Sequence, residues 1–85
     1  MITVLREQGF RVVIYRNDHP PPHAHVFYQA GEARIDISEG QAGRPRVLSA
    51  DGYGKADLRR ARDLVLRTRA ELLEQWTRIH GRPDR

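Results

Sequence analysis

Hydrophobic and polar side chains alternate one by one in the first half of the chain, as they do in strands with one buried face. Residues 33–38 show this period cleanly, whereas residues 10–15 and 23–29 are indicated as strands by β-branched and aromatic residues and by side chains of one face spaced two apart. The side chains expected to point into the core are Phe10, Val12, Ile14, Ala24, Val26, Tyr28, Ala33, Ile35 and Ile37. Residues 3–5 form a short apolar start, and residues 47–48 are a candidate short edge strand.

Turn-forming residues separate these segments. Asn17 and Asp18 close the first long strand, and Ala30–Gly31 predicts a hairpin turn between the next two. Residues 40–46 contain glycine and proline breakers and predict a loop. Gly52–Gly54 ends this half of the chain. Together the turns and strands predict an antiparallel sheet of three to four strands within residues 2–49.

From Lys55 onward the apolar residues recur every three or four positions, which is the spacing of one helix face. The expected stripe consists of Leu58, Ala61, Val65, Thr68, Leu72, Trp76 and Ile79. Thr68 and Glu71 also form a T-x-x-E capping box, so the segment is one long helix or two helices that meet near Thr68. We favour one helix, with a kink allowed, over residues 55–80. Gly81 and Pro83 predict its end.

These elements predict an α+β fold in which a sheet is covered on one face by C-terminal helix. A chain of 85 residues has room for one domain, which we expect to span residues 1–85. It contains no cysteine, which excludes disulfides, thiolate metal sites and a cysteine nucleophile. No signal-peptide pattern opens the sequence, and no apolar run approaches the roughly 20 residues of a membrane span. We therefore expect a cytoplasmic protein that does not bind membranes.

The positive charge is concentrated in the last third of the chain. Residues 1–54 hold six basic and six acidic side chains, whereas residues 55–85 hold nine basic and five acidic ones. Fourteen of the fifteen basic residues are arginine, whose planar guanidinium matches phosphate and carboxylate groups. A genome whose codon usage favours arginine would give the same bias, so the charge alone assigns no partner.

Three histidines and three prolines lie together between the first two long strands. His19 is followed by Pro20–Pro22, and His23 and His25 open the next strand. Residues two apart on a strand point to the same face, so the imidazoles of His23 and His25 can converge. Histidine is both a metal ligand and a proton carrier near neutral pH. We therefore place the candidate functional site in this segment.

A metal site would need a third ligand besides His23 and His25. A straight polyproline segment would place His19 roughly 12 Å away, unless a turn or a cis proline brings it closer. Asp18 and Asp36 are the nearby carboxylates that could complete the set. The histidines could instead act as catalytic acid and base, or they could hydrogen-bond the neighbouring strands or form a protein interface.

Several stretches of the chain carry a resemblance to one bacterial family. They are Thr3–Arg6 with Gly9–Phe10, Tyr15–His19, Pro21–Val26, Glu32–Arg34, Leu64–Val65 and Leu72–Trp76. Over residues 2–81 the chain resembles the domain-of-unknown-function family numbered 4160, and the pattern H-x-P-P-H-x-H-V is the most specific part. The third proline, Pro20, and the loop at residues 43–46 depart from the family's pattern.

The resemblance implies a small stand-alone bacterial protein, encoded beside another small protein in a toxin–antitoxin-like pairing. No catalytic residue is established for the family, so only the histidines of its motif carry over to this chain.

The first functional hypothesis is a small toxin that acts on RNA through histidine acid/base chemistry. RNA cleavage needs a base for the 2′-hydroxyl, an acid for the leaving group and positive charge near the phosphate, and it needs no cofactor. The candidate catalytic residues are His19, His23 and His25, and the candidate phosphate contacts are Arg16 and then Arg34. This expectation includes neither a cofactor nor a metal ion.

The second hypothesis is a protein-interaction module without catalytic chemistry, in which the Pro-His loop is structural or forms an interface. Under both hypotheses we expect a protein partner, either a second copy of the chain or the small product of a neighbouring gene. RNA is an expected partner only under the first. The sequence leaves open whether the chain is an enzyme.

Overall fold

The computed structural model describes residues 2–38 and 45–81, which form one antiparallel sheet and one helix. The elements in chain order are β1 (Ile2–Glu7), β2 (Phe10–Ile14), β3 (His23–Tyr28), β4 (Gly31–Asp36), β5 (Val47–Asp51) and α1 (Lys55–His80). In the sheet each strand pairs with its neighbours in the sequence, in the order β1-β2-β3-β4-β5. The α+β class and the sheet-then-helix order agree with the prediction.

The described residues form five strands, one more than the upper limit of the prediction. The added strand is β1, because residues 3–5 were expected only as a short apolar start, whereas β5 is a longer form of the candidate edge strand at residues 47–48. The register of β1 against β2 shifts between Thr3 and Leu5, and that of β5 against β4 shifts between Arg34 and Ile35. Such irregularities change which residues face the core, so a strict two-residue period underestimates both strands.

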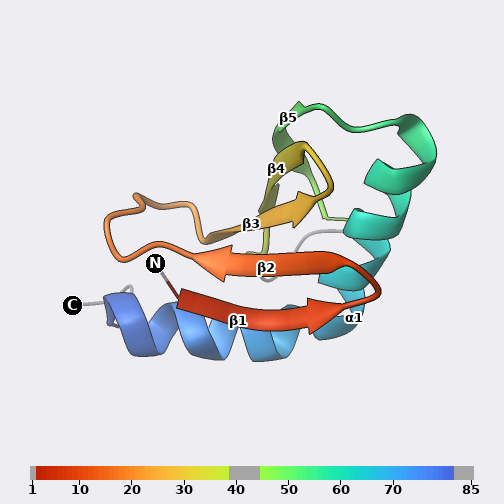
Figure 1. Ribbon diagram of the computed structural model, residues 1–85. Coiled ribbons are helices and arrows are strands. Elements are labelled where there is room, and N and C mark those ends of the chain that lie inside the picture. The colour runs from red at the N-terminus through yellow and green to blue at the C-terminus, as the bar shows by residue number, and fades with distance from the viewer. Residues whose placement is uncertain (1, 39–44, 82–85) are drawn as a thin grey trace.

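The residues predicted to point inward form the core between the sheet and α1. Eight of these nine side chains are buried, and Tyr28 packs against the core while partly exposed. From α1, the buried residues are Ala61, Leu64, Val65, Leu72 and Trp76. Leu64 is an addition to the predicted stripe, in which Leu58 and Ile79 are only partly buried. Figure 1 shows α1 crossing one face of the sheet.

The helix is continuous from Lys55 to His80, so the alternative of two helices is wrong. Thr68 does not begin a second helix, because its hydroxyl donates a hydrogen bond to the carbonyl of Leu64 one turn earlier, at 2.8 Å. The helix ends before Gly81, whose φ of +83° lies in the left-handed region. No helix in the described residues combines the length and apolar character that crossing a membrane requires.

The hairpin between β3 and β4 turns one residue earlier than predicted. Tyr28 pairs with Gly31, so the turn residues are Gln29 and Ala30, and Gln29 has a φ of +53°. Gly31 belongs to β4, where a Cβ atom would lie 2.8 Å from the carbonyl oxygen of Gly52. Glycine is needed here because the chain after β5 passes close to its backbone. The predicted loop at residues 40–46 lies mostly outside the described residues.

The face of the sheet opposite α1 carries the polar side chains of the inner strands. His25 pairs with Arg34 in the register of β3 and β4, so both residues lie on this face. The connection from β2 to β3 lies at the same end of the molecule as the C-terminal end of α1 (Figure 1). The candidate site is built at this end.

Candidate functional site

The connection after β2 brings a carboxylate next to the first histidines of β3. The backbone N–H of Asp18 donates to the carbonyl of Tyr15 at 3.3 Å, and the N–H of Tyr15 donates to Asp18 Oδ2 at 3.4 Å. Aspartate in a turn commonly bonds its own neighbouring backbone in this way. After the turn, the prolines lead into β3, and the Pro20–Pro21 peptide bond is cis. The N–H of Ile37 donates to the carbonyl of Pro22 at 3.0 Å, which anchors the end of the connection beside β4.

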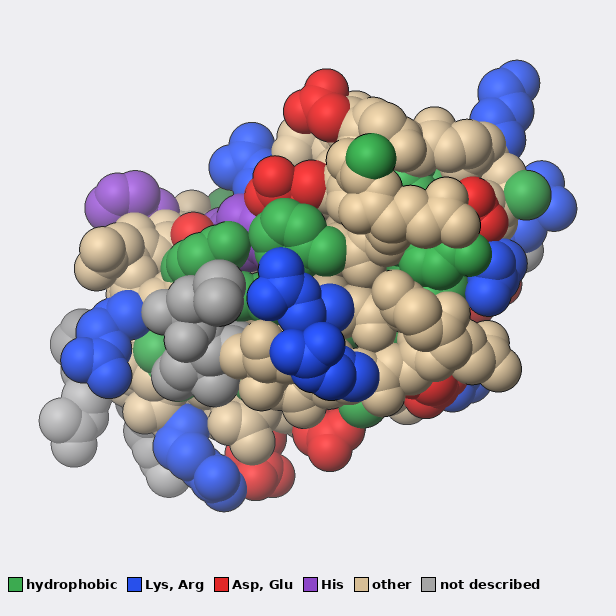
Figure 2. Space-filling view, in the orientation of Figure 1, with side chains coloured by type: hydrophobic (Ala, Val, Ile, Leu, Met, Phe, Trp, Pro, Cys, Tyr) green, Lys and Arg blue, Asp and Glu red, His purple; other side chains and the backbone are tan. Residues whose placement is uncertain are grey.

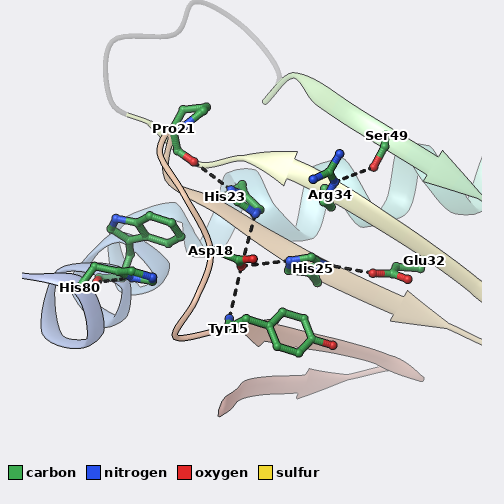
Figure 3. Close-up of polar contacts among 10 residues, drawn as sticks. Tyr15, Asp18, Pro21, His23, His25, Glu32, Arg34, Ser49 and His80 are labelled. Atoms are coloured by element: carbon green, nitrogen blue, oxygen red, sulfur yellow. Dashed lines mark hydrogen bonds and ion pairs between the residues drawn. The ribbon is translucent and has the colours of Figure 1, made fainter. Parts of the chain in front are cut away.

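Asp18, His23 and His25 meet at one point, and we call these three residues the Asp-His cluster. Asp18 Oδ2 lies 3.0 Å from His25 Nε2 and 3.3 Å from His23 Nε2 (Figure 3). One ligand-type atom from each residue lies within 4.8 Å of the others. His23 and His25 are only 5% and 7% exposed. The cluster is therefore a largely enclosed polar centre at the end of the sheet.

The other nitrogen of each imidazole faces an oxygen acceptor. His23 Nδ1 lies 2.9 Å from the carbonyl oxygen of Pro21, and His25 Nδ1 lies 3.1 Å from Glu32 Oε2. A carbonyl and a carboxylate accept hydrogen bonds, so both Nδ1 atoms are the protonated donors. In a neutral imidazole this leaves the lone pair on Nε2. Both Nε2 atoms face Asp18 Oδ2, and the 3.0 Å contact of His25 Nε2 is a hydrogen bond when that nitrogen carries a proton.

His23 Nε2 has an incomplete environment. It is buried and makes no hydrogen bond within the described residues, although it lies 3.3 Å from Asp18 Oδ2. The short distance and the missing hydrogen bond are consistent, because a hydrogen bond also requires a suitable angle between the two groups. A buried nitrogen without a hydrogen bond destabilises the folded state unless another group, such as a water molecule or an ion, binds to it.

Aromatic rings enclose the cluster on two sides. The ring of Tyr15 meets that of His25 edge-on, with centroids 4.5 Å apart. The ring of Trp76 lies 5.5 Å from that of His23, and the ring of His80 stacks on Trp76 at 3.8 Å. Trp76 is the chain's single tryptophan. The C-terminal end of α1 therefore forms one wall of the site.

A pocket of about 340 Å³ opens beside the cluster, and we call it the Arg34 pocket. Its lining residues are Asn17, Asp18, His19, Pro20, Pro21, His23, Arg34 and Leu48. His19 and Arg34 are exposed there, and the Nε–H of Arg34 donates to Ser49 Oγ at 2.9 Å. The exposed imidazole of His19 and the guanidinium of Arg34 therefore line the same pocket as Asp18 and His23 of the Asp-His cluster.

The structure divides the residues that the sequence singled out. His19, His23 and Arg34 line the Arg34 pocket, whereas Arg16 is exposed and His25 is buried, and neither of these two lines it. The group that joins His23 and His25 in the described residues contains Asp18 in place of His19. Of the two carboxylates considered from the sequence, Asp18 is the one that takes this place.

Two contributors to the site were missed by the sequence analysis. Glu32 lies opposite Phe27 in the register, diagonal to His25, and that position follows only from the pairing of β3 with β4. The helical spacing predicts Trp76 as a core residue, and it is buried, but its ring also faces His23. An i, i+2 pattern on a strand reveals neither contact, because both cross between elements.

Charged side chains of both signs cover the face shown in Figure 2, without a single uniformly basic area in that view. Several arginines are held by neighbours. Arg67 pairs with Glu7 of β1 at 2.6 Å, Arg78 pairs with Glu74 at 2.8 Å, and Arg62 donates to the carbonyl of Pro45 at 3.1 Å. The Arg34 pocket is therefore of interest for its local chemistry, more than for the net charge of the chain.

The fold and the site define a small α+β domain with a carboxylate–histidine centre beside an arginine-lined pocket. Residues 9–77 match the domain-of-unknown-function family DUF4160, and the chain belongs to that family. This confirms the family expected from the sequence. No curated protein and no solved structure matches the chain.

Proposed function

We propose that this chain is the RNA-cleaving member of a toxin–antitoxin-like pair and that it acts in the bacterial cytoplasm. The observation that carries the proposal is the composition of the Arg34 pocket. An exposed imidazole, His19, and a guanidinium, Arg34, lie in one pocket with Asp18 and His23. These are the groups that a phosphodiester needs for proton transfer and for neutralisation of its charge.

The proposed reaction is an internal transfer within the RNA. The 2′-hydroxyl gives its proton to the Asp18–His23 pair, its oxygen attacks the adjacent phosphorus, and the bond from phosphorus to the 5′-oxygen breaks. His19 donates a proton to that leaving oxygen. The products are a 2′,3′-cyclic phosphate and a free 5′-hydroxyl, with one proton taken up and one released. RNA is a suitable substrate because its own 2′-hydroxyl is the nucleophile, so the protein does not have to supply one.

The residue roles follow from exposure and position. His19 is exposed in the pocket and can contact the leaving group, whereas His25 is enclosed by Asp18, Glu32 and Tyr15 and acts as a positioning residue. Arg34 is the preferred phosphate contact because it lines the pocket and its Ser49 bond holds the side chain in place. Arg16 does not line the pocket and becomes the second choice.

The test is cleavage of an end-labelled RNA by the purified chain, with the product ends identified by mass spectrometry. His19→Ala and Arg34→Ala should each reduce the cleavage rate about 100-fold or more, since a general acid typically contributes about 10² to 10⁴ and a group that stabilises transition-state charge about 10² to 10³. Arg59→Ala, an exposed arginine of α1 away from the pocket, is the matched control and should cleave like the parent chain. Cleavage that survives both pocket variants, or no cleavage of any RNA, would overturn the proposal.

A second candidate function is a protein-interaction module, and the outer edges of the sheet favour it. Within the described residues no strand pairs with the outer side of β1 or of β5. An open edge offers backbone donors and acceptors to a strand of another chain. The partner would be a second copy of this chain or the small product of a neighbouring gene. Binding of such a partner is also compatible with the cleavage proposal.

A further inference from the structure

We infer that the Asp-His cluster is a binding site for one divalent transition-metal ion of the zinc class. The ligand atoms would be Asp18 Oδ2, His23 Nε2 and His25 Nε2. The inference goes beyond the proposed function, which needs no metal. Where both hold, the ion would supply a bound hydroxide as the base for the 2′-hydroxyl proton, in place of the Asp18–His23 pair.

The spacing of the three atoms fits such an ion. Ligands at about 2.0–2.2 Å from a tetrahedral zinc ion lie about 3.3 Å from one another. Asp18 Oδ2 is 3.0 Å from one imidazole nitrogen and 3.3 Å from the other. All three atoms lie within 4.8 Å of one another. Small side-chain adjustments are therefore sufficient to place an ion between them.

The outer contacts of the two imidazoles are those of metal-binding histidines. A ligating histidine usually donates its second ring N–H to a carboxylate or a backbone carbonyl, which fixes the tautomer and the ring orientation. His25 Nδ1 has Glu32 at 3.1 Å, and His23 Nδ1 has the carbonyl of Pro21 at 2.9 Å. Both Nε2 atoms face Asp18 Oδ2, and an ion bound there would replace the proton that His25 Nε2 can share with this oxygen.

His23 Nε2 supplies an independent reason. The residue is 95% buried, and this nitrogen makes no hydrogen bond within the described residues. A proton on His23 Nε2 would instead make this ring an imidazolium in an enclosed site, where desolvation opposes the charge. A single metal ion would be coordinated by both Nε2 atoms, and the carboxylate of Asp18 would neutralise part of its charge.

The ligand types and the open side indicate which ion and which kind of site. Two imidazoles and one carboxylate suit zinc and its first-row neighbours, whereas magnesium and calcium prefer oxygen ligands alone. Asp18 and His23 also line the Arg34 pocket, so a fourth coordination position would face that pocket. Three protein ligands with one open position is the arrangement of catalytic zinc sites.

The test begins with the full chain freed of metal by a chelator and then titrated with Zn²⁺ by calorimetry. We expect one ion per chain and no binding of Mg²⁺ at the same concentration. Co²⁺ should give the visible absorption of a tetrahedral nitrogen–oxygen site. It should also quench the fluorescence of Trp76, whose ring lies 5.5 Å from that of His23. Asp18→Asn and His25→Ala should each weaken Zn²⁺ binding at least 100-fold.

His19→Ala is the matched control, because His19 lies outside the Asp-His cluster. It should bind Zn²⁺ like the parent chain while losing RNA cleavage. Circular dichroism verifies that each variant is folded. If Asp18→Asn or His25→Ala does not fold, the parent chain alone tests the inference, through its Zn²⁺ stoichiometry, its Co²⁺ spectrum and the quenching of Trp76. Absence of Zn²⁺ binding, or binding that depends on His19 and is unaffected by Asp18→Asn, would overturn it.

Parallel cleavage assays separate this inference from the proposed function. Zn²⁺ binding without RNA cleavage supports the ion site and removes the proposed function. Cleavage by a metal-free chain that binds no Zn²⁺ supports the function and removes the ion site. Cleavage that requires Zn²⁺ supports both, and the absence of binding and cleavage removes both.

Discussion

At the residue scale, the most informative side chain is His25. One of its nitrogens lies 3.0 Å from Asp18 and the other 3.1 Å from Glu32, while its residue exposure is only 7%. Glu32 is half exposed, so solvent screens that contact more than it screens the contact with Asp18. The two carboxylates therefore have different roles. Asp18 belongs to the centre of the cluster, whereas Glu32 orients the ring from outside.

This difference predicts the effect of Glu32→Gln. The amide can present either its oxygen or its NH₂ group to Nδ1, so it holds the tautomer less firmly than a carboxylate does. We expect Zn²⁺ affinity to fall about 10-fold or more, which is the usual effect of removing an outer partner of a ligating histidine. Calorimetric titration measures the change. The matched control is Glu74→Gln on α1, an exposed carboxylate paired with Arg78. Equal affinities for both variants would show that Asp18 alone orients His25.

At the element scale, a hydrogen bond from the hydroxyl of Tyr53 links the connection between β5 and α1 to the middle of the sheet. The Tyr53 OH donates to the carbonyl of Val26 in β3 at 2.9 Å. Burial is the largest cause that raises the pKa of Tyr53 to about 12, and the nearby Asp57 and Tyr28 contribute to the same increase. The folded state therefore keeps this hydroxyl protonated at a pH where an unfolded tyrosine ionises.

The raised pKa predicts a pH-dependent loss of stability. Tyrosine in the unfolded chain ionises near pH 10, so the Tyr53 contribution is complete below pH 10 and is lost as the pH rises to about 12. Tyr53→Phe should lower the free energy of unfolding by about 1 kcal/mol at pH 8, because it removes one hydrogen bond. The difference between the parent chain and Tyr53→Phe should shrink at pH 11. Urea unfolding at both pH values measures it, and a constant difference would contradict the assignment.

At the scale of the whole molecule, the site depends on three parts of the chain that meet at one end. The β2–β3 connection supplies Asp18 and His19, β3 supplies the buried histidines, and the last turns of α1 supply Trp76. The core on the opposite face of the sheet holds α1 in place. The position of Trp76 beside His23 is thus a consequence of packing along the full length of the helix.

The open edges of the sheet lead to a prediction about assembly. The first four residues of β5, Val47 to Ala50, are uncharged, and Asp51 is its one charged residue. Lysine on an edge strand opposes pairing with another chain. We expect the chain to form a homodimer, or a complex with the neighbouring gene product on co-expression. Ala50→Lys should weaken either assembly at least 10-fold, whereas Ala56→Lys on α1 should not. Light scattering and sedimentation measure the stoichiometry. A monomer that also fails to bind the co-expressed neighbour would contradict the prediction.

Local sequence patterns were sufficient for the inner elements of the fold. Apolar residues spaced two apart in β2, β3 and β4 identified the core-facing side chains, because successive side chains of a strand must point to opposite faces. The three-to-four residue spacing after Gly54 likewise identified α1. The lengths of the outer strands were underestimated because their registers are irregular. The predicted hairpin turn included Gly31, but Gly31 lies in β4, where the backbone of Gly52 approaches it closely.

For the candidate site, the sequence by itself determined that His23 and His25 share a face, since their two-residue spacing on a strand has no other outcome. It could not determine which groups meet them. Asp18 reaches both imidazoles through a turn, Glu32 through the register of β3 with β4, and Trp76 through the packing of α1. These contacts join residues whose distances depend on the whole fold, and periodicity carries information only within one element. Tertiary structure therefore decided that the centre is Asp18, His23 and His25, and that His19 lies in the pocket beside it.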